Sequence, residues 1–275
     1  MTLAAVLAIL LSLPAHANAA VTLGSNLLKP AVGSWGCGAA PCTGVQASLP
    51  GLVTVSPVNG TVTAWRVRGG NGTDTGRLRV LAPSADGASF SFTATSATQT
   101  VPSGTAVSTF PTSLPIAAGD LIGLDDDHAG GSSFGDAGGT GVKLIFQPTP
   151  GNGAALVPTF SGGGELLFNA DVVPTNRFPK PKQPKSTPRG IDVLVVQVPN
   201  SGFLTAKNKK GNDLIRAITK TVSGAGFVKL KLKPSRAARA ALRSVGKARG
   251  QIKVIFTPTG GSAFSRAAKA TLRKV

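Results

Sequence analysis

Few side chains in this sequence can perform acid–base or nucleophilic chemistry. The 275-residue chain has two histidines and no tyrosine, although histidine is the usual general base in enzymes. His16 follows the apolar N-terminal stretch, so a serine triad would depend on His128. We therefore expect a protein that is not an enzyme, and a hydrolase centred on His128 is the alternative.

The densest group of potential metal ligands is a set of five aspartates around His128. Three are consecutive, one lies upstream and one lies downstream in a glycine-rich segment. Calcium prefers several oxygen ligands from flexible loops, so the set is a candidate site for a structural calcium ion. Its spacing matches no standard calcium loop, and an acidic loop exposed to solvent is the alternative. No other cofactor is expected. The candidate ligands are Asp120, Asp125, Asp126, Asp127 and Asp136.

The chain has two cysteines, Cys37 and Cys42, which lie beside Gly and Pro residues. Zinc would need further ligands, and none are nearby. In an exported chain, two cysteines at this spacing predict a small disulfide loop. Such a loop would chiefly hold a turn in place, because a short closed loop adds little stability.

Trp35 and Trp65 are the only tryptophans, and carbohydrate-binding proteins usually expose flat aromatic rings to the sugar. Trp65 follows the alternation of the expected core positions. Trp35 lies two residues before Cys37 and is the candidate ligand contact; packing over the disulfide is its alternative role. A carbohydrate-binding module that uses a loop near Trp35 or Asp125–Asp127 is therefore a second functional hypothesis.

Residues 1–19 predict a signal peptide. An apolar run from Leu3 to Leu13 is followed by Pro14 and by alanines at the A-x-A spacing of a cleavage site. A membrane span needs about 20 apolar residues, and neither this run nor any later segment approaches that length. A buried N-terminal strand or helix is the alternative. We expect a secreted, extracellular protein, attached to the cell wall in one version of this hypothesis, with no transmembrane segment in the mature chain.

Charge and proline divide the remaining chain into three parts. Residues 21–173 carry 6 Lys and Arg against 9 Asp and Glu, a net charge of −3, whereas residues 174–275 carry 23 against 2, a net charge of +21. Residues 174–190 contain five prolines and several lysines with almost nothing to bury, so we expect a semi-rigid linker of polyproline character. The expected domains are therefore 21–173 and 191–275.

The N-terminal domain has the pattern of short strands between turns. Runs of Val, Leu, Ile and Phe recur between Gly, Asn, Asp and Pro, which favours an all-β, jelly-roll-like sandwich over an α/β fold. Its two Asn-Gly-Thr sequences match the glycosylation sequon, although turn formation explains them as well. The candidate strands are residues 60–69, 76–83, 88–96, 120–125, 142–148 and 164–173.

Two of these candidate strands carry alternating arginines. Arg66 and Arg68 lie in the first, and Arg77 and Arg79 lie in the second. A hairpin between the two strands would set like charges opposite one another, which is unfavourable. We therefore expect strands that are not neighbours, or arginines that are simply solvated, and an anionic ligand between them is the alternative.

The C-terminal domain should be a smaller immunoglobulin-like sandwich with one short helix. Residues 228–233 alternate apolar residues with lysines, as in a half-buried strand. Ser235 is a candidate helix N-cap and Gly246 a candidate C-cap. The apolar stripe expected between the caps consists of Ala238, Ala241, Leu242 and Val245.

The cations of this strand and helix lie on the faces opposite the expected core. An amphipathic pattern requires polar residues there, but it does not require all of them to be positive. We therefore regard the surplus charge as a candidate polyanion-binding surface. Its members are Lys229, Lys231, Lys233, Arg236, Arg239 and Arg243.

Two parts of the chain resemble known exported proteins. The block from "GFVKLKLKPSRAARAAL" to "IKVIFTPTGGSAFSRAAKATLRKV" resembles the basic Ig-like repeat modules of secreted bacterial surface proteins. The stretches "SPVNGTVTAWRVRG", "LPIAAGDLIGLD" and "ELLFNADVV" are similar to an N-terminal module of the same kind of protein. The resemblance implies an exported bacterial protein and supplies no catalytic or binding residues.

The sequence pI near 10.9 predicts non-specific, salt-sensitive binding to nucleic acid in vitro. We expect no specific nucleic-acid partner, because export, few aromatic residues and the lack of a recognition motif all count against one. The expected partners are anionic cell-envelope polymers or polysaccharide, and the oligomeric state stays open. The leading hypothesis is a secreted, non-enzymatic surface protein whose basic module adheres to the envelope and presents the N-terminal sandwich.

Overall fold

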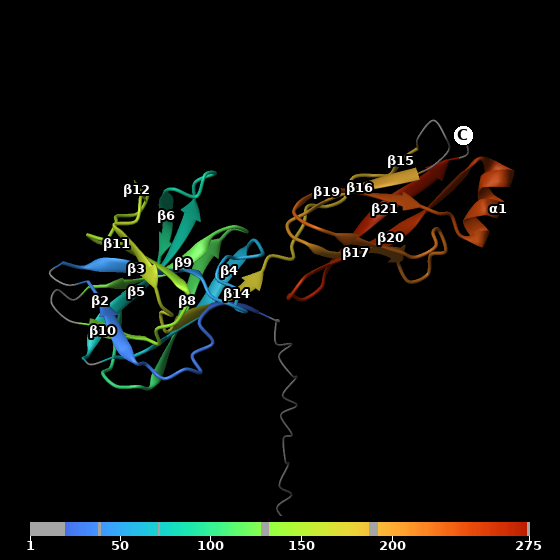
Figure 1. The fold of residues 1–275 in the computed structure, drawn as a ribbon. Helices are drawn as coiled ribbons and strands as arrows, with labels where there is room; N and C mark the ends of the chain where they lie inside the picture. Colours follow the sequence, from blue (N-terminus) through green and yellow to red (C-terminus); the bar gives the residue numbers. More distant parts are fainter. Residues whose placement is uncertain (1–19, 38–39, 71, 128–131, 187–191, 274–275) are drawn as a thin grey trace, which may run out of the picture.

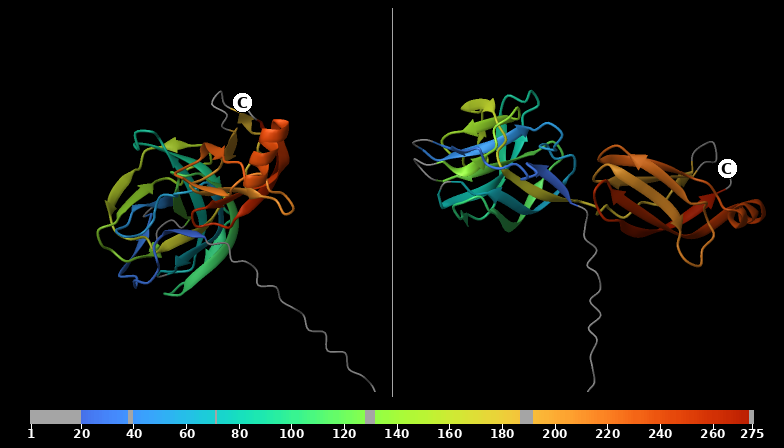
Figure 2. Two further views of the ribbon diagram at one scale, coloured as in Figure 1. Left: turned by 90° about the vertical axis from the view of Figure 1, so that its right-hand side faces the viewer. Right: turned by 60° about the horizontal axis from the view of Figure 1, so that its bottom comes forward.

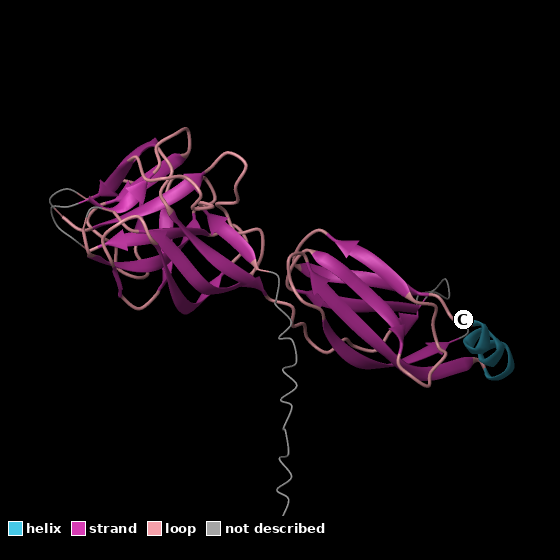
Figure 3. Cartoon of the chain, turned by 90° about the horizontal axis from the view of Figure 1, so that it is seen from below, coloured by secondary structure: helices cyan, strands magenta, loops and turns pink. Residues whose placement is uncertain are grey.

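The computed structural model describes residues 20–37, 40–70, 72–127, 132–186 and 192–273. The chain is almost entirely β-strand and forms two sandwiches side by side, with one short helix at the far end of the second (Figures 1 and 3). The expectation of an all-β chain with two sandwiches and one helix is confirmed. The predicted signal peptide, residues 1–19, lies outside the described residues, and so does His128.

In the first sandwich, a four-stranded sheet packs against a larger sheet. The strand order of the four-stranded sheet is β1-β14-β4-β8. The larger sheet has the order β12-β6-β5-β9-β3-β11-β13, with β7 on β5, and β10 and β2 form a separate pair. The strands are β1 (Val21–Gly24), β2 (Gly33–Gly36), β3 (Cys42–Ser48), β4 (Gly60–Arg68), β5 (Asp74–Pro83), β6 (Phe90–Thr95), β7 (Gln99–Val101), β8 (Val107–Ile116), β9 (Leu121–Asp126), β10 (Ser132–Asp136), β11 (Val142–Phe146), β12 (Ala155–Leu156), β13 (Phe160–Gly163) and β14 (Phe168–Pro174).

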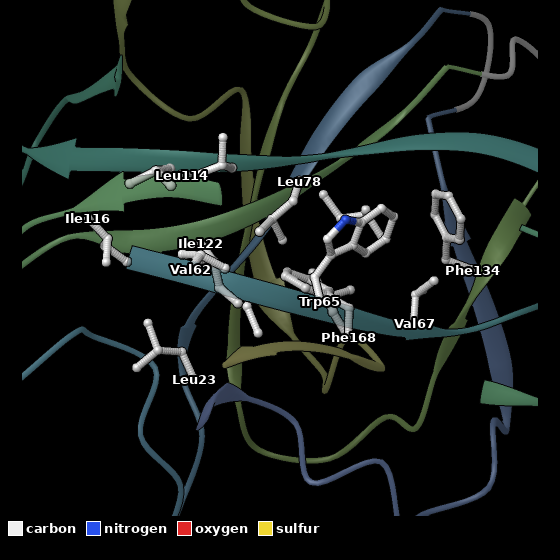
Figure 4. Packing of buried hydrophobic residues seen from close by; sticks show 14 of the residues in the cluster. Leu23, Val62, Trp65, Val67, Leu78, Leu114, Ile116, Ile122, Phe134 and Phe168 are labelled. Atoms are coloured by element: carbon white, nitrogen blue, oxygen red, sulfur yellow. The ribbon is translucent and has the colours of Figure 1, made fainter. Parts of the chain in front are cut away.

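Alternation along the strands builds the main core between these two sheets. Trp65 on β4 and Leu78 on β5 are fully buried in it, together with Phe134 on β10 (Figure 4). The opposite face of the larger sheet buries a second cluster around Phe92 and Phe146. Strand β9 is therefore covered on both faces, since all six of its residues are buried.

The second sandwich has the two-sheet arrangement of an immunoglobulin-like fold. One sheet has the order β15-β16-β19 and the other β18-β17-β20-β21, so the first, second and fifth strands face the other four. Figure 2 shows these two layers beside the first sandwich. The elements are β15 (Lys185–Ser186), β16 (Asp192–Val198), β17 (Gly202–Asn208), β18 (Ile218–Val222), β19 (Gly226–Leu232), α1 (Arg236–Val245), β20 (Lys247–Pro258) and β21 (Phe264–Arg273).

Helix α1 follows the predicted capping pattern. The Ser235 hydroxyl accepts a hydrogen bond from the Ala238 backbone N–H at 3.0 Å, and Gly246 ends the helix in the left-handed conformation at φ 70°. Ala238 is buried, and Ala241 and Leu242 pack partly against the core. Val245 was expected on the same stripe but is 65% exposed.

The proline-rich segment after β14 packs against the second sandwich in part. Phe178 is the exception to the expectation that this segment buries almost nothing, because it lies in the second core beside Phe256 and Phe264. Pro181 is buried and Pro184 half-buried. Burial at every third residue is the spacing of a polyproline II helix with one face on a surface.

The two sandwiches meet through a reciprocal pair of asparagines. Asn200, in the turn between β16 and β17, accepts a hydrogen bond from the Asn59 backbone N–H at 2.7 Å and donates to the Asn59 carbonyl at 2.9 Å. It also donates to the Thr175 carbonyl at 2.7 Å, and the Asn59 side chain donates to the Pro199 carbonyl at 2.7 Å. We call these contacts the asparagine junction.

Candidate functional site

The five aspartates predicted to bind calcium are held in different places by different partners. Asp120 lies in the turn before β9 and accepts the Ala117 backbone N–H at 2.9 Å. Asp136 on β10 pairs with Lys143 on β11. Asp125, Asp126 and Asp127 lie at the end of β9, where Asp125 and Asp126 are buried.

This arrangement does not bring the five candidate ligands to one place. Within the described part of the chain, no group of three or more His, Cys, Asp or Glu side chains could hold a metal ion. The physical reason is that Asp125, Asp127 and Asp136 face arginine or lysine side chains, which already balance their charges.

Asp125 lies at the centre of a buried cluster of charged side chains. The register of β9 with its neighbours β3 and β5 brings these side chains together. The neighbours of Asp125 on the two adjacent strands are Thr43 on β3 and Arg77 on β5. Thr43 donates a hydrogen bond to Oδ1 of Asp125 at 2.6 Å, whereas Nε of Arg77 lies 3.3 Å from Oδ2. Nη1 of Arg79 lies 3.4 Å from the same oxygen. We call Thr43, Arg77, Arg79, Asp125 and Asp127 the Asp125 cluster.

Burial dominates the electrostatics of this cluster. It raises the pKa of Asp125 to about 6, although the Thr43 hydroxyl and the two guanidinium groups oppose the rise. Burial also lowers the pKa of Arg79, whose side chain is 4% exposed. The Arg79 guanidinium is further held by a hydrogen bond to the Pro150 carbonyl at 2.6 Å and lies over the Phe92 ring. The cluster is therefore a structural element of the first sandwich, beside the buried residues Phe92 and Phe146.

The two arginine-bearing strands are not neighbours, as predicted. Strand β4 belongs to the four-stranded sheet and β5 to the larger sheet. Arg66 pairs with Asp171 on the adjacent strand β14, and the pKa of Asp171 is lowered chiefly by that hydrogen bond. Carboxylates of the protein itself thus balance Arg66, Arg77 and Arg79.

Trp35 does not form an exposed platform for a ligand. It is 5% exposed and lies in the main core with Cys37 and Cys42, its ring centroid 5.4 Å from that of Phe134. The ring is therefore not displayed to solvent as a ligand contact would require, because β2 places it over Gly44. The predicted disulfide between Cys37 and Cys42 is confirmed.

Gly44 is required by this packing, and its replacement should destabilise the fold. A Cβ atom at Gly44 would lie 2.6 Å from two ring atoms of Trp35. We expect Gly44→Ala to lower the free energy of unfolding by about 1–3 kcal/mol, the usual cost of overpacking a core, as measured by denaturant unfolding. Gly151→Ala is the matched control, since a Cβ there meets no atom within 4 Å. Equal stability of the two variants would contradict the prediction.

The first sandwich also contains a polar pocket of about 390 Å³. Glu165 in its lining accepts hydrogen bonds from the Ser25 hydroxyl and Lys29 Nζ, both at 2.7 Å. Leu49 and Leu52 supply the apolar part of the lining. The pocket carboxylate is thus already bonded to two groups of the protein.

The basic residues of the first sandwich are held by internal partners. Besides Arg79, four of these residues pair with carboxylates. The pairs are Lys29 with Glu165, Arg66 with Asp171, Arg77 with Asp125 and Asp127, and Lys143 with Asp136. Arg68 donates instead to the Leu27 and Thr105 carbonyls.

The second sandwich shows the opposite arrangement. Among described residues, all six ion pairs lie in the first sandwich, and none includes a lysine or arginine of the second. The predicted alternation of β19 is observed, since Lys229, Lys231 and Lys233 are exposed. On α1, Arg236 and Arg243 are exposed and Arg239 is half-buried.

A second group of cations, which sequence reasoning did not select, covers the outer face of the other sheet. Lys207 on β17 lies directly opposite Lys253 on β20, and Lys247 lies opposite Arg273 on β21. Like charges in directly opposed positions are unfavourable. Lys209 and Lys210 join Lys207 and Lys253 around a hollow of about 500 Å³. The alternation Lys247, Arg249, Gln251, Lys253 was the signal that could have revealed this face.

The comparisons with known proteins assign no family. No protein-family model matches the sequence, and no curated protein matches it. A solved structure, a GH2 β-galacturonidase from Eisenbergiella tayi bound to galacturonate, matches with a TM-score of 0.25 and 12% identity. The match covers 88% of this chain and 44% of that one, so this chain spans less than half of that protein. A likeness at this TM-score carries no argument about function.

The residues that the structure describes contain one helix, α1. Helix α1 has ten residues, and the described residues include no helix with the length and hydrophobicity of a membrane span.

Proposed function

We propose that this chain is a secreted, non-enzymatic, cell-surface or cell-wall-associated bacterial protein. Its second sandwich adheres to anionic polymers of the cell envelope and presents the first sandwich. The observation that carries the proposal is the contrast in charge pairing between the two halves. In the first sandwich, carboxylates of the protein pair with five of the six basic residues, whereas residues 174–275 contain 23 basic against 2 acidic residues, too few acids to balance the cations.

Physical chemistry supports an external anionic partner for these cations. Net charge of one sign destabilises a compact domain through self-repulsion, and directly opposed lysines add to that cost. A polymer with regular negative charges relieves both and releases its counterions on binding. The asparagine junction would hold the first sandwich at a defined orientation relative to the bound polymer.

Binding to envelope polymers should depend on the charge of the basic side chains and not on whether lysine or arginine carries it. We expect the chain to bind isolated cell-wall fragments at low salt and to be released by about 0.5 M salt, because counterion release drives the association. Replacing Lys229, Lys231, Lys233, Arg236, Arg239 and Arg243 with glutamine should weaken binding at least about tenfold, as measured by sedimentation with the fragments.

A charge-retaining variant provides the matched control for this experiment. Exchanging lysine for arginine and arginine for lysine at the same six positions keeps the charge and changes the shape, so it should bind as the original does. Binding that resists high salt, or that falls equally in both variants, would overturn the proposed function.

A further inference from the structure

The outer face of the sheet β15-β16-β19 carries apolar side chains that the fold does not require. Val193 and Val195 on β16 point outward, because the alternating residues Leu194 and Val196 are buried in the core. Outward positions of a half-exposed antiparallel sheet are ordinarily polar. Val195 is nevertheless 40% exposed, and Phe227 at the start of β19 is 74% exposed.

These side chains form the floor of a groove along β16. Val193, Val195 and Gln197 lie between the segment Pro179–Lys185 on one side and β19 on the other, around a hollow of about 280 Å³. Phe227 lines this hollow and also a neighbouring one of about 330 Å³ at the turn between β18 and β19. We call the first of these hollows the β16 groove.

Lysines border the apolar floor on both sides. Strand register places Lys185 of β15 and Lys231 of β19 on either side of Val193, and Lys229 opposite Val195. Lys180 and Lys182 are exposed along the proline-rich wall. An occupant must therefore combine negative charge with an apolar face.

We propose that the β16 groove binds an acidic polysaccharide, with the C–H face of a sugar ring against Phe227 and the valines and its carboxylates paired with the bordering lysines. The inference rests on the proposed function and names the class of polymer. Polyphosphate satisfies the lysines but has no apolar face, whereas a neutral glycan has the face without the charge. The outward positions from Val193 to Gln197 span about 13 Å, enough for a short stretch of sugar units.

The test compares two exposed phenylalanines in the mature full-length chain. Phe227→Ala should weaken binding of alginate oligosaccharides about tenfold, which corresponds to about 1.4 kcal/mol, as measured by titration calorimetry. Phe203 is 53% exposed on the outer face of the other sheet, so Phe203→Ala should change alginate affinity less than about twofold. Neither variant should change the affinity for polyphosphate by more than about twofold, since charge alone governs that contact.

Two double lysine variants, each of which removes two positive charges, test which sheet binds the polymer. Lys182→Gln with Lys229→Gln should weaken alginate binding at least about threefold more than Lys253→Gln with Lys269→Gln, since only the first pair borders the groove. Equal losses from the two pairs, or from the two phenylalanine variants, would overturn the groove inference while leaving the proposed function standing. A Phe227 dependence seen with anionic lipid vesicles or oligothymidine, and not with alginate, would also overturn it. A chain that binds neither alginate nor polyphosphate at low salt would overturn both proposals.

Discussion

Replacing Arg79 with methionine should lower the free energy of unfolding by about 3 kcal/mol at pH 8, because the change removes one partner of a buried ion pair. Methionine fills a comparable volume without a charge. The variant loses the contact of Nη1 with Asp125 and the hydrogen bond to the Pro150 carbonyl. Asp125 is then left with Arg77, which is partly exposed, as its nearest cation. Denaturant unfolding at several pH values measures the effect.

The loss should shrink to about 1 kcal/mol at pH 5. Burial raises the pKa of Asp125 in the folded protein to about 6, compared with 3.8 for an ordinary aspartate. The stability linked to this carboxyl is therefore fully present below about pH 4 and is lost as the pH rises through about 6. Removing a nearby cation raises that pKa further, so the variant is penalised most where Asp125 must ionise. At pH 5 the carboxyl is mostly protonated in both proteins, and mainly the lost hydrogen bond remains.

Arg66→Met supplies a control with a different pH dependence. Asp171 has a lowered pKa, caused chiefly by its hydrogen bond to Arg66, so it stays ionised from pH 5 to pH 8. The stability contributed by a carboxyl with a lowered pKa in the folded protein is present above the ordinary pKa of that carboxyl. It is lost only as the pH falls through the pKa of the folded state. The pair is also partly exposed, with side-chain exposures of 31% and 19%, so we expect a constant loss of about 1 kcal/mol or less. An Arg79 variant with a pH-independent loss would contradict the role given to Asp125.

Replacing Asn200 with alanine should uncouple the two sandwiches. Asn200 is 2% exposed, and its amide accounts for three of the hydrogen bonds at the asparagine junction. The change leaves the Asn59 N–H and two carbonyls without these partners, and we expect a loss of about 2 kcal/mol. In small-angle X-ray scattering, the radius of gyration should increase, because the sandwiches then sample many relative orientations.

Ser201→Ala tests whether that effect comes from the amide or from the turn. Ser201 is the next residue, and its hydroxyl makes one long contact of 3.4 Å with Thr259. We expect its scattering profile and stability to match those of the unchanged protein. If Asn200→Ala behaves like Ser201→Ala, the junction does not hold the orientation, and the presentation of the first sandwich would need another cause.

Local pattern predicted many elements of this fold. All six strands expected in the first sandwich have counterparts in β4, β5, β6, β9, β11 and β14. The helix caps at Ser235 and Gly246 are confirmed as well. These features depend on residues close together in sequence, so alternation and capping chemistry suffice to predict them.

Strands β8 and β3 were not predicted from the sequence, because their places in the sheets depend on residues far away in the chain. Strand β8 contains Pro111 and Pro115, which argue against a central strand, yet β8 lies at the edge of its sheet and tolerates them. Strand β3 contains Thr43 and Gln46, which look solvent-facing in isolation. Both are buried because Asp125 bonds the first, whereas the carbonyl of Gly164 and the N–H of Leu166 bond the second.

The sequence alone determined the division of charge, the β-rich character of both halves and the outward position of the β19 lysines. Those properties follow from composition and from period-two alternation within single strands. Only the tertiary structure decided which charges are balanced. Strand register set Asp125 between Thr43 and Arg77, and the packing of β2 buried Trp35 over Gly44. The β16 groove likewise exists because folding brings the proline-rich segment and β19 to either side of one strand, a neighbourhood that depends on long-range pairing and not on local pattern.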